Sequence, residues 1–205
     1  MKIGLYFGTF NPIHVGHLVI ANFMASISEL DQIWLVVSPQ NPLKKKSNLL
    51  ENYHRLALVQ EGIKDNPKLR ASNIEFKLPV PSYTSTTLAY LREKYPENKF
   101  SLIMGEDNLR TFHKWKNHET ILENHQIYVY PRVHTVQELE AFTTEDTQGN
   151  GFADHKNVHL CNDVPVMKIS SSFIRSHLRE GKDVQYLLTE PVHKYLVEMN
   201  FYQKK

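Results

Sequence analysis

GTFNPIHVGH, residues 8–17, stands directly after the apolar run KIGLYF of residues 2–7 and before a helix-length segment. With two glycines, a proline and two histidines, it is too irregular for a strand and too rich in helix breakers for the interior of a helix. A turn between a strand and a helix leaves the first backbone N–H groups of the helix without partners, at the carboxyl end of the strand. Because these donors and the helix dipole attract negative charge, the stretch predicts a phosphate site.

The residue types in this turn fit that use. Gly8 lets the backbone approach a phosphate closely, and Gly16 leaves room for a ligand at the start of the helix. His14 and His17 lie one helical turn apart, so both rings can face the ligand, and either becomes cationic if a phosphate raises its pKa. A plain turn with exposed histidines is the alternative. A shared metal ion is the weakest reading, because no carboxylate or cysteine lies nearby to complete the ligand set.

Short apolar runs alternate with helix-length segments along most of the chain. Runs that are apolar throughout are typical of strands in a parallel sheet with helices on both faces. The sequence therefore predicts an α/β fold with a doubly wound, mainly parallel sheet covered by helices on both faces. The expected strands are residues 2–7, 32–38, 68–76, 99–105, 125–131 and 158–162, and the expected helices are residues 16–28, 51–64, 84–95 and 191–201.

Length and composition exclude several classes of protein. The length of 205 residues favours one domain, residues 1–205, and the polar, turn-rich residues 143–157 are expected to form a surface insertion in it. The net charge of +2 is well below the basic excess of a dedicated nucleic-acid binder. The single cysteine, Cys161, excludes an intrachain disulfide and a cysteine metal site. Without a signal peptide or a membrane-crossing run, we expect a cytoplasmic protein with neither a membrane nor a nucleic-acid partner.

A second anion site is predicted near the other end of the chain, at ISSSFIR, residues 169–175. Its three consecutive serines precede an amphipathic run that contains Phe173, Ile174 and Leu178. Serine is a favoured N-cap, so simple capping of a helix is the plain reading. A helix start with additional hydroxyls and an arginine, Arg175, also forms an anion clamp, and the two readings are compatible.

These two stretches carry a resemblance to a known superfamily. GTFNPIHVGH resembles the HxGH signature of the nucleotidyltransferases, and ISSSFIR resembles their second signature, ISSTxIR, with serine in place of threonine at Ser172. The resemblance implies a Rossmann-like sheet and catalytic roles for His14, His17 and Arg175. The residues that it implies in ATP binding at the two signatures are Gly8, Thr9, Phe10, Gly16, Ile169, Ser170, Ser171 and Ser172.

The middle of the chain narrows the resemblance. PSYTSTTL at residues 81–88 and MGEDNLRTFHKW at residues 104–115 resemble motifs of the bacterial nicotinate-mononucleotide adenylyltransferases, and the similarity covers nearly the whole chain. It implies that Trp115 stacks on the pyridine ring and that Tyr83 and Thr84 bind the mononucleotide. Each motif also has a plain reading, for example Trp115 as a half-buried surface anchor. The same resemblance implies ATP contacts at Gly105, Asp107 and Arg132, and a contact of Lys44 with the phosphate of the mononucleotide.

Two positions depart from the pattern of these relatives. Leu43, in the basic loop NPLKKK of residues 41–46, stands where relatives often have histidine, just before the basic residue. Asn11 stands where many relatives have aspartate, so it keeps a turn-forming side chain without the charge.

The chemistry that the resemblance implies is adenylyl transfer from ATP to nicotinate mononucleotide, a step in NAD synthesis. The attacking phosphomonoester is largely dianionic at neutral pH, so it needs no general base. We expect Mg²⁺ to be held mainly by the phosphates of ATP and by water, with no metal ligands from the protein. The alternatives are transfer to another phosphomonoester such as phosphopantetheine, a non-catalytic nucleotide-binding module and a tRNA-synthetase-like enzyme. The sequence is also compatible with a homo-oligomer.

Overall fold

Six strands form one sheet in the computed structural model, which describes residues 1–40, 49–132, 149–165 and 167–203. The strand order is β3-β2-β1-β4-β5-β6, and every neighbouring pair is parallel. This order is that of a doubly wound Rossmann sheet, so the predicted fold class is confirmed. The strands are β1 (Lys2–Gly8), β2 (Gln32–Val37), β3 (Leu69–Ser72), β4 (Lys99–Gly105), β5 (Ile127–Tyr130) and β6 (Val158–Leu160).

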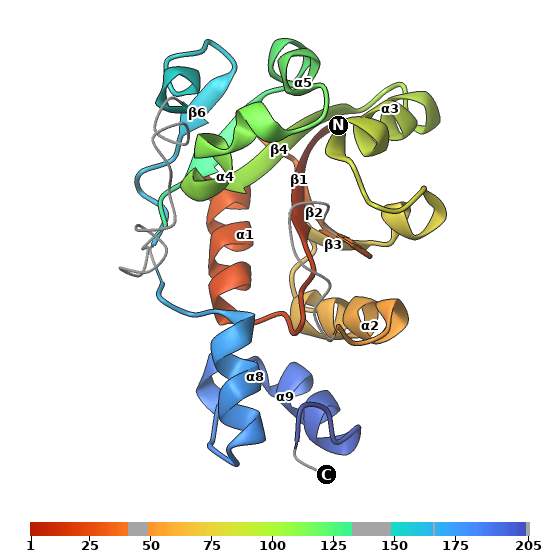
Figure 1. Ribbon diagram of the computed structural model, residues 1–205, viewed down its shortest axis with the longest axis vertical. Helices are drawn as coiled ribbons and strands as arrows, with labels where there is room; N and C mark the ends of the chain where they lie inside the picture. Colours follow the sequence, from red (N-terminus) through yellow and green to blue (C-terminus); the bar gives the residue numbers. More distant parts are fainter. Residues whose placement is uncertain (41–48, 133–148, 166, 204–205) are drawn as a thin grey trace.

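Helices follow most strands and return the chain to the start of the next one. In Figure 1, α8 and α9 lie at the end of the molecule toward which β1 runs, and α8 begins beside the start of α1. The sequence did not delimit α4 and α5, because they are too short to show a helical period. The helices are α1 (Val15–Ile27), α2 (Asn52–Ile63), α3 (Thr84–Lys94), α4 (Glu106–Arg110), α5 (His118–Asn124), α8 (Ser171–Arg179) and α9 (Glu190–Glu198), with 3-10 turns η1 (Ile74–Lys77), η2 (Phe112–Lys114), η3 (Gly149–Phe152) and η4 (Gln185–Leu187).

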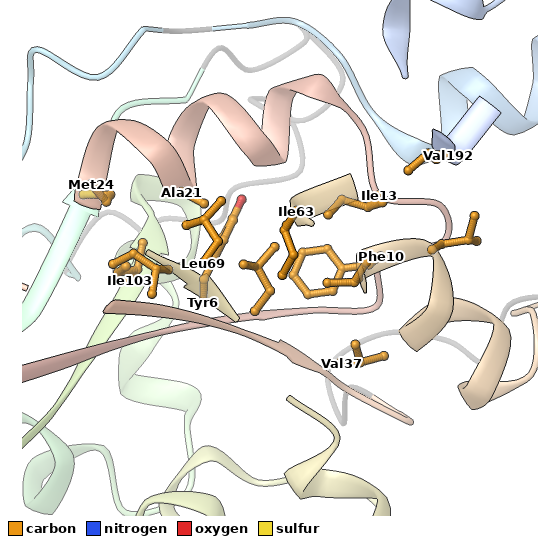
Figure 2. Packing of buried hydrophobic residues seen from close by; sticks show 14 of the residues in the cluster. Tyr6, Phe10, Ile13, Ala21, Met24, Val37, Ile63, Leu69, Ile103 and Val192 are labelled. Carbon is orange, nitrogen blue, oxygen red and sulfur yellow. The ribbon is translucent and has the colours of Figure 1, made fainter. Parts of the chain in front are cut away.

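Two hydrophobic clusters of buried residues cover the two faces of the sheet. Successive side chains of a strand point to opposite faces, so Leu5 of β1 belongs to one cluster and Tyr6 to the other. The cluster with Tyr6 takes in residues of α1, α2, α8 and α9, some of which Figure 2 shows, and the cluster with Leu5 takes in residues of α3, α4 and α5. Helices therefore cover both faces, as predicted.

The third strand is shorter than predicted. It was expected over residues 68–76, but β3 ends at Ser72 and the chain turns into η1. The hydroxyl of Ser72 accepts a hydrogen bond from the backbone N–H of Ile74 (3.4 Å), a local contact that competes with the ladder of a sheet. Beyond this turn the buried carboxylate of Glu75 accepts a hydrogen bond from Thr87 on α3 (2.8 Å). At this point the chain therefore buries Glu75 against Thr87 instead of continuing as a strand of the sheet.

Part of the expected surface insertion packs onto the domain. Within residues 149–157, the ring of Phe152 meets Phe112 edge-on, with 5.5 Å between centroids. The amide of Asn157 donates to the carbonyls of Leu122 (2.9 Å) and Glu123 (3.1 Å) at the end of α5. This half of the segment thus belongs to the packed structure, while residues 143–148 lie outside the described part of the chain.

Within the described ranges, every helix is too short or too polar to traverse a bilayer.

Candidate active site

A cavity of about 610 Å³ opens at the carboxyl ends of β1, β2 and β5. This is the edge at which open parallel sheets bind their ligands. Its walls come from the turn after β1, the ends of the neighbouring strands, the start of α2 and the start of α8. Twelve residues predicted to be functional line it: Gly8, Thr9, Phe10, His14, Gly16, His17, Arg132, Ile169, Ser170, Ser171, Ser172 and Arg175.

Hydrogen bonds join the two signature stretches directly. Arg175 Nη1 donates to the carbonyl of Asn11 (2.7 Å), and Ser171 Oγ donates to the carbonyl of Pro12 (2.8 Å). These contacts bridge 164 and 159 positions of sequence, respectively. The structure therefore places the start of α1 and the start of α8 side by side on one cavity, as a shared anion site requires.

A buried arginine holds the other side of the turn. Arg55 on α2 is fully buried, and its Nη1 donates to the carbonyls of Thr9 (2.7 Å) and Ser38 (2.8 Å). Its Nε donates to the carbonyl of Leu50 (3.0 Å). A buried guanidinium is tolerated only when its donors are satisfied, and here these three carbonyls and the side-chain oxygen of Asn52 accept them.

Phe10 contributes backbone to the cavity and its side chain to the core. Its ring is buried and packs into the hydrophobic cluster (Figure 2). The backbone adopts φ 44°, in the left-handed region, which costs a residue with a side chain about 1 to 2 kcal/mol. A Cβ at Gly8 would lie 2.8 Å from this ring. Glycine is thus required at position 8 by the ring of Phe10, in addition to any ligand.

His14 and His17 stack on each other, with 3.7 Å between ring centroids. The backbone N–H of His14 donates to Nδ1 of His17 (3.3 Å), so the neutral ring of His17 carries its proton on Nε2. A Cβ at Gly16 would lie 3.1 Å from Nδ1 of His14, so this glycine makes room first for the histidine ring.

His14 is buried, with 5% of its surface exposed. Burial, and second the charge of Arg132, lower the pKa of His14 to about 4. The ring is therefore neutral in the free protein at neutral pH. Its Nδ1 has no hydrogen-bond partner in the described structure, which leaves a buried polar atom at the cavity wall.

Each serine at the start of α8 has a different task. Ser170 Oγ accepts a hydrogen bond from the backbone N–H of Phe173 (3.2 Å) and caps the helix. Ser171 reaches the turn, and Ser172 Oγ accepts a bond from Arg175 Nη2 (3.1 Å). The predicted capping by serine is therefore confirmed, and the anion clamp stays a prediction. The expected amphipathic face holds for the buried Ile174 but not for Phe173, which is 47% exposed because it points away from the core.

The three other residues expected to contact ATP, Gly105, Asp107 and Arg132, lie at or beside the cavity. Arg132 lines the cavity and forms an ion pair with Asp107. Gly105 and Asp107 do not line it, whereas Asn108 does. A Cβ at Gly105 would lie 2.5 Å from Oδ1 of Asp107, so the glycine allows that carboxylate to fold back toward β4. Asp107 therefore acts on the cavity only indirectly, through its ion pair with Arg132.

The residues expected to bind the mononucleotide also lie outside the cavity lining. Tyr83, Thr84 and Trp115 are half-buried, and Lys116 Nζ lies 4.9 Å from the centroid of the Tyr83 ring. The indole N–H of Trp115 is buried without a hydrogen-bond partner among the described residues. The segment is tied to the cavity wall, because the backbone N–H of the preceding Ser82 donates to the carbonyl of Gln40 (3.1 Å). Lys44 and Leu43 lie outside the described residues.

The sequence did not predict three residues that line the cavity: Tyr6, Tyr130 and Arg55. Tyr6 and Tyr130 line the cavity with their hydroxyl oxygens 3.3 Å apart, and burial raises the pKa of both, so both stay neutral. Tyr130 ends a strand at the ligand edge, and that position could have identified it. Tyr6 lies inside an apolar strand, and Arg55 lies in a helix where arginine is normally solvent-exposed, so neither has a distinctive pattern.

Comparisons with known proteins agree with this arrangement. Residues 5–177 match the model of the cytidylyltransferase-like family. A probable nicotinate-nucleotide adenylyltransferase of Flavobacterium psychrophilum is 56% identical over 204 residues, 100% of both chains, and one of Cytophaga hutchinsonii is 47% identical over 98% of both. The fold is shared with nicotinic acid mononucleotide adenylyltransferase of Plasmodium falciparum, solved in complex with NaAD, at a TM-score of 0.76 and 19% identity over 98% of this chain and 97% of that one.

The neutral state of buried His14 predicts a pH dependence of stability. The pKa is about 4 in the folded state, against 6.5 for an unperturbed histidine, so the unfolded chain binds more protons between these values. Stability contributed by His14 is therefore present above pH 6.5 and is lost as the pH falls toward 4. We expect the free energy of unfolding of the native protein to fall by roughly 2 to 3 kcal/mol relative to His14→Asn over this range, measured by urea denaturation. A difference that is constant across these pH values would contradict the neutral assignment.

Proposed function

Because the chain belongs to the nicotinate-nucleotide adenylyltransferases of the cytidylyltransferase-like family, we propose that it transfers the adenylyl group of ATP to nicotinate mononucleotide. The products are nicotinate adenine dinucleotide and pyrophosphate. The observation that carries this proposal at the atomic level is the pair of hydrogen bonds that join α8 to the turn before α1. They give one cavity two helix N-termini and the side chains of His17 and Arg175, which together suit a polyphosphate.

The reaction is a displacement at the α-phosphorus of ATP. A phosphate oxygen of the mononucleotide forms the new P–O bond, and the bond from the α-phosphorus to the oxygen that bridges it to the β-phosphate breaks. The electron pair leaves with pyrophosphate. The attacking phosphate is already largely dianionic at neutral pH, so no side chain has to remove a proton. The protein must align two anions that repel each other and stabilise charge on the leaving group.

His17 and Arg175 supply the donors for that charge. The neutral ring of His17 carries its proton on Nε2, which can donate to a phosphate oxygen. The guanidinium of Arg175 has five N–H groups, and its bonds to Asn11 and Ser172 fix its plane while leaving further donors for phosphate. Donors that are already oriented stabilise a developing charge without reorganisation during the reaction.

Mg²⁺ enters this account as part of the ATP substrate. Among the described residues that line the cavity, Glu51 is the one carboxylate. Groups of three or more potential metal-ligating side chains do not occur in the described ranges. A cavity with this lining favours a cation that arrives on the phosphates of the nucleotide, which is how Mg²⁺ commonly binds.

We propose that the mononucleotide binds beside the cavity, next to Gln40 at its wall and on the neighbouring segments that carry Tyr83, Thr84 and Trp115. The bond from Ser82 to Gln40 connects this segment to the cavity wall. The half-buried ring of Trp115 offers a face for the pyridine, and its indole N–H offers a donor that the described protein does not satisfy. Both features suit a planar ring with a polar substituent.

The proposal is tested by pyrophosphate release from Mg·ATP with nicotinate mononucleotide, nicotinamide mononucleotide and phosphopantetheine as acceptors. We expect nicotinate mononucleotide to have the highest kcat/KM of the three. Turnover with phosphopantetheine and none with the pyridine nucleotides would contradict the assignment of the acceptor. ATP binding without turnover for any acceptor would instead indicate a nucleotide-binding module.

His17→Ala tests the role of the donor at the start of α1. Loss of one preorganised donor that acts on transition-state charge lowers kcat by roughly 100-fold or more, and we expect this reduction in the pyrophosphate assay. His193→Ala on α9 is the matched control, since no role in the cavity is assigned to that residue. Turnover of His17→Ala close to that of the control would refute the catalytic role.

A further inference from the structure

The side chain of Asn11 is fully buried in the turn between β1 and α1. Its Oδ1 accepts one hydrogen bond from the backbone N–H of Leu50 (3.1 Å) and another from the hydroxyl of Tyr202 (2.5 Å). Tyr202 lies beyond the end of α9, 191 positions away along the chain. The contact therefore joins a residue that belongs to neither signature to the centre of the phosphate-binding turn.

The segment that carries Tyr202 is firmly packed. The backbone N–H of the preceding Phe201 donates to the carbonyl of Leu196 on α9 (3.0 Å). The ring of Phe201 meets the ring of His54 on α2 edge-on, with 4.7 Å between centroids, and Tyr195 Oη lies 3.0 Å from Nδ1 of the same histidine. Because α2 and α9 hold this segment from two sides, the hydroxyl of Tyr202 has a fixed place at the turn.

Arg175 holds the same asparagine through a different atom. Its Nη1 donates to the backbone carbonyl of Asn11 (2.7 Å), while Tyr202 donates to the side chain of Asn11. One residue thus connects the guanidinium at the start of α8 to the segment after α9. A movement of the backbone at Asn11 that turned this carbonyl away from Arg175 would also shift the side chain that Tyr202 holds, so the contact with Tyr202 opposes such a movement.

The contact between Tyr202 and Asn11 is neutral. Burial raises the pKa of Tyr202, so its hydroxyl stays protonated and acts as the donor. The charges of Arg175 and Arg55 lie close enough to act on this hydroxyl. A carboxylate in the place of Asn11 would pair with these arginines, whereas an amide leaves the charge of Arg175 for an anion in the cavity.

We infer that Tyr202 is a positioning residue for adenylyl transfer: through Asn11, it holds Arg175 in the orientation that meets the phosphates of ATP. This inference rests on the proposed function. Tyr202 does not line the cavity, so its hydroxyl acts on the reaction only through the turn. Misplacement of one donor by about 1 Å is enough to lower the rate of a transfer that depends on alignment.

The test is a double-mutant cycle of Tyr202→Phe and Arg175→Ala, read as kcat/KM for ATP in the pyrophosphate assay. Tyr202→Phe removes the hydroxyl and keeps the ring. In the native background we expect kcat/KM to fall about fivefold, as for the loss of one neutral hydrogen bond. In the Arg175→Ala background, which lacks the group being positioned, Tyr202→Phe changes kcat/KM by less than about twofold. Tyr186→Phe, with a residue 88% exposed, is the control and has no effect in either background.

Two results would overturn the inference. Equal losses of kcat/KM in both backgrounds would show that Tyr202 acts independently of Arg175. An unchanged kcat/KM of Tyr202→Phe in the native background would show that the hydroxyl has no role in the reaction. The affinity for Mg·ATP, measured by calorimetry for the native protein and Tyr202→Phe, separates this question from the proposed function. If the native protein binds ATP without releasing pyrophosphate, the proposed function fails. In that case, a lower affinity of Tyr202→Phe for Mg·ATP would still support a role of Tyr202 in positioning Arg175. An unchanged affinity would refute that role.

Discussion

Side-chain donors from α2 and α8 hold the carbonyl oxygens of the turn between β1 and α1, and the geometry of the cavity depends on these hydrogen bonds. Arg55 bonds the carbonyl of Thr9, and Arg175 bonds that of Asn11. A free turn of this composition would sample many conformations, and fixing each residue costs about 1 to 2 kcal/mol of conformational entropy. Charged donors with buried partners offset that cost. The turn thereby keeps His14 and His17 in place at the carboxyl end of β1.

The charges around the cavity are arranged to receive an anion without strong repulsion in the free protein. His14 is neutral because burial and Arg132 lower its pKa, and Arg132 itself forms an ion pair with Asp107. The donors of Arg55 go to three backbone carbonyls and to the side-chain oxygen of Asn52. An arriving polyphosphate would counter the effect of Arg132 on His14 and so raise the pKa of that ring. The site thus gains positive character when its ligand binds.

Sequence patterns identified the parts of this site that depend on local structure. The turn after β1 and the serine cap of α8 contain residue types that favour only a few backbone conformations. Both are present in the structure as predicted. Parallel strands bring such turns to one edge, so their meeting in one cavity also followed from the fold. Arg55 and Tyr202 could not be found in this way, because their roles arise from tertiary contacts with backbone and side chains far away in sequence. The early end of β3 at Ser72 was missed for a related reason, since the burial of Glu75 against Thr87 is not a periodic signal.

The account depends most on two helix starts that hold one polyphosphate together. A crystal structure of the protein with a non-hydrolysable ATP analogue tests this directly. The account predicts hydrogen bonds from the triphosphate both to Nε2 of His17 and to the guanidinium of Arg175, with donor–acceptor distances of about 2.7 to 3.2 Å. A triphosphate that contacts only one of the two, or that lies outside the cavity between α1 and α8, would contradict it.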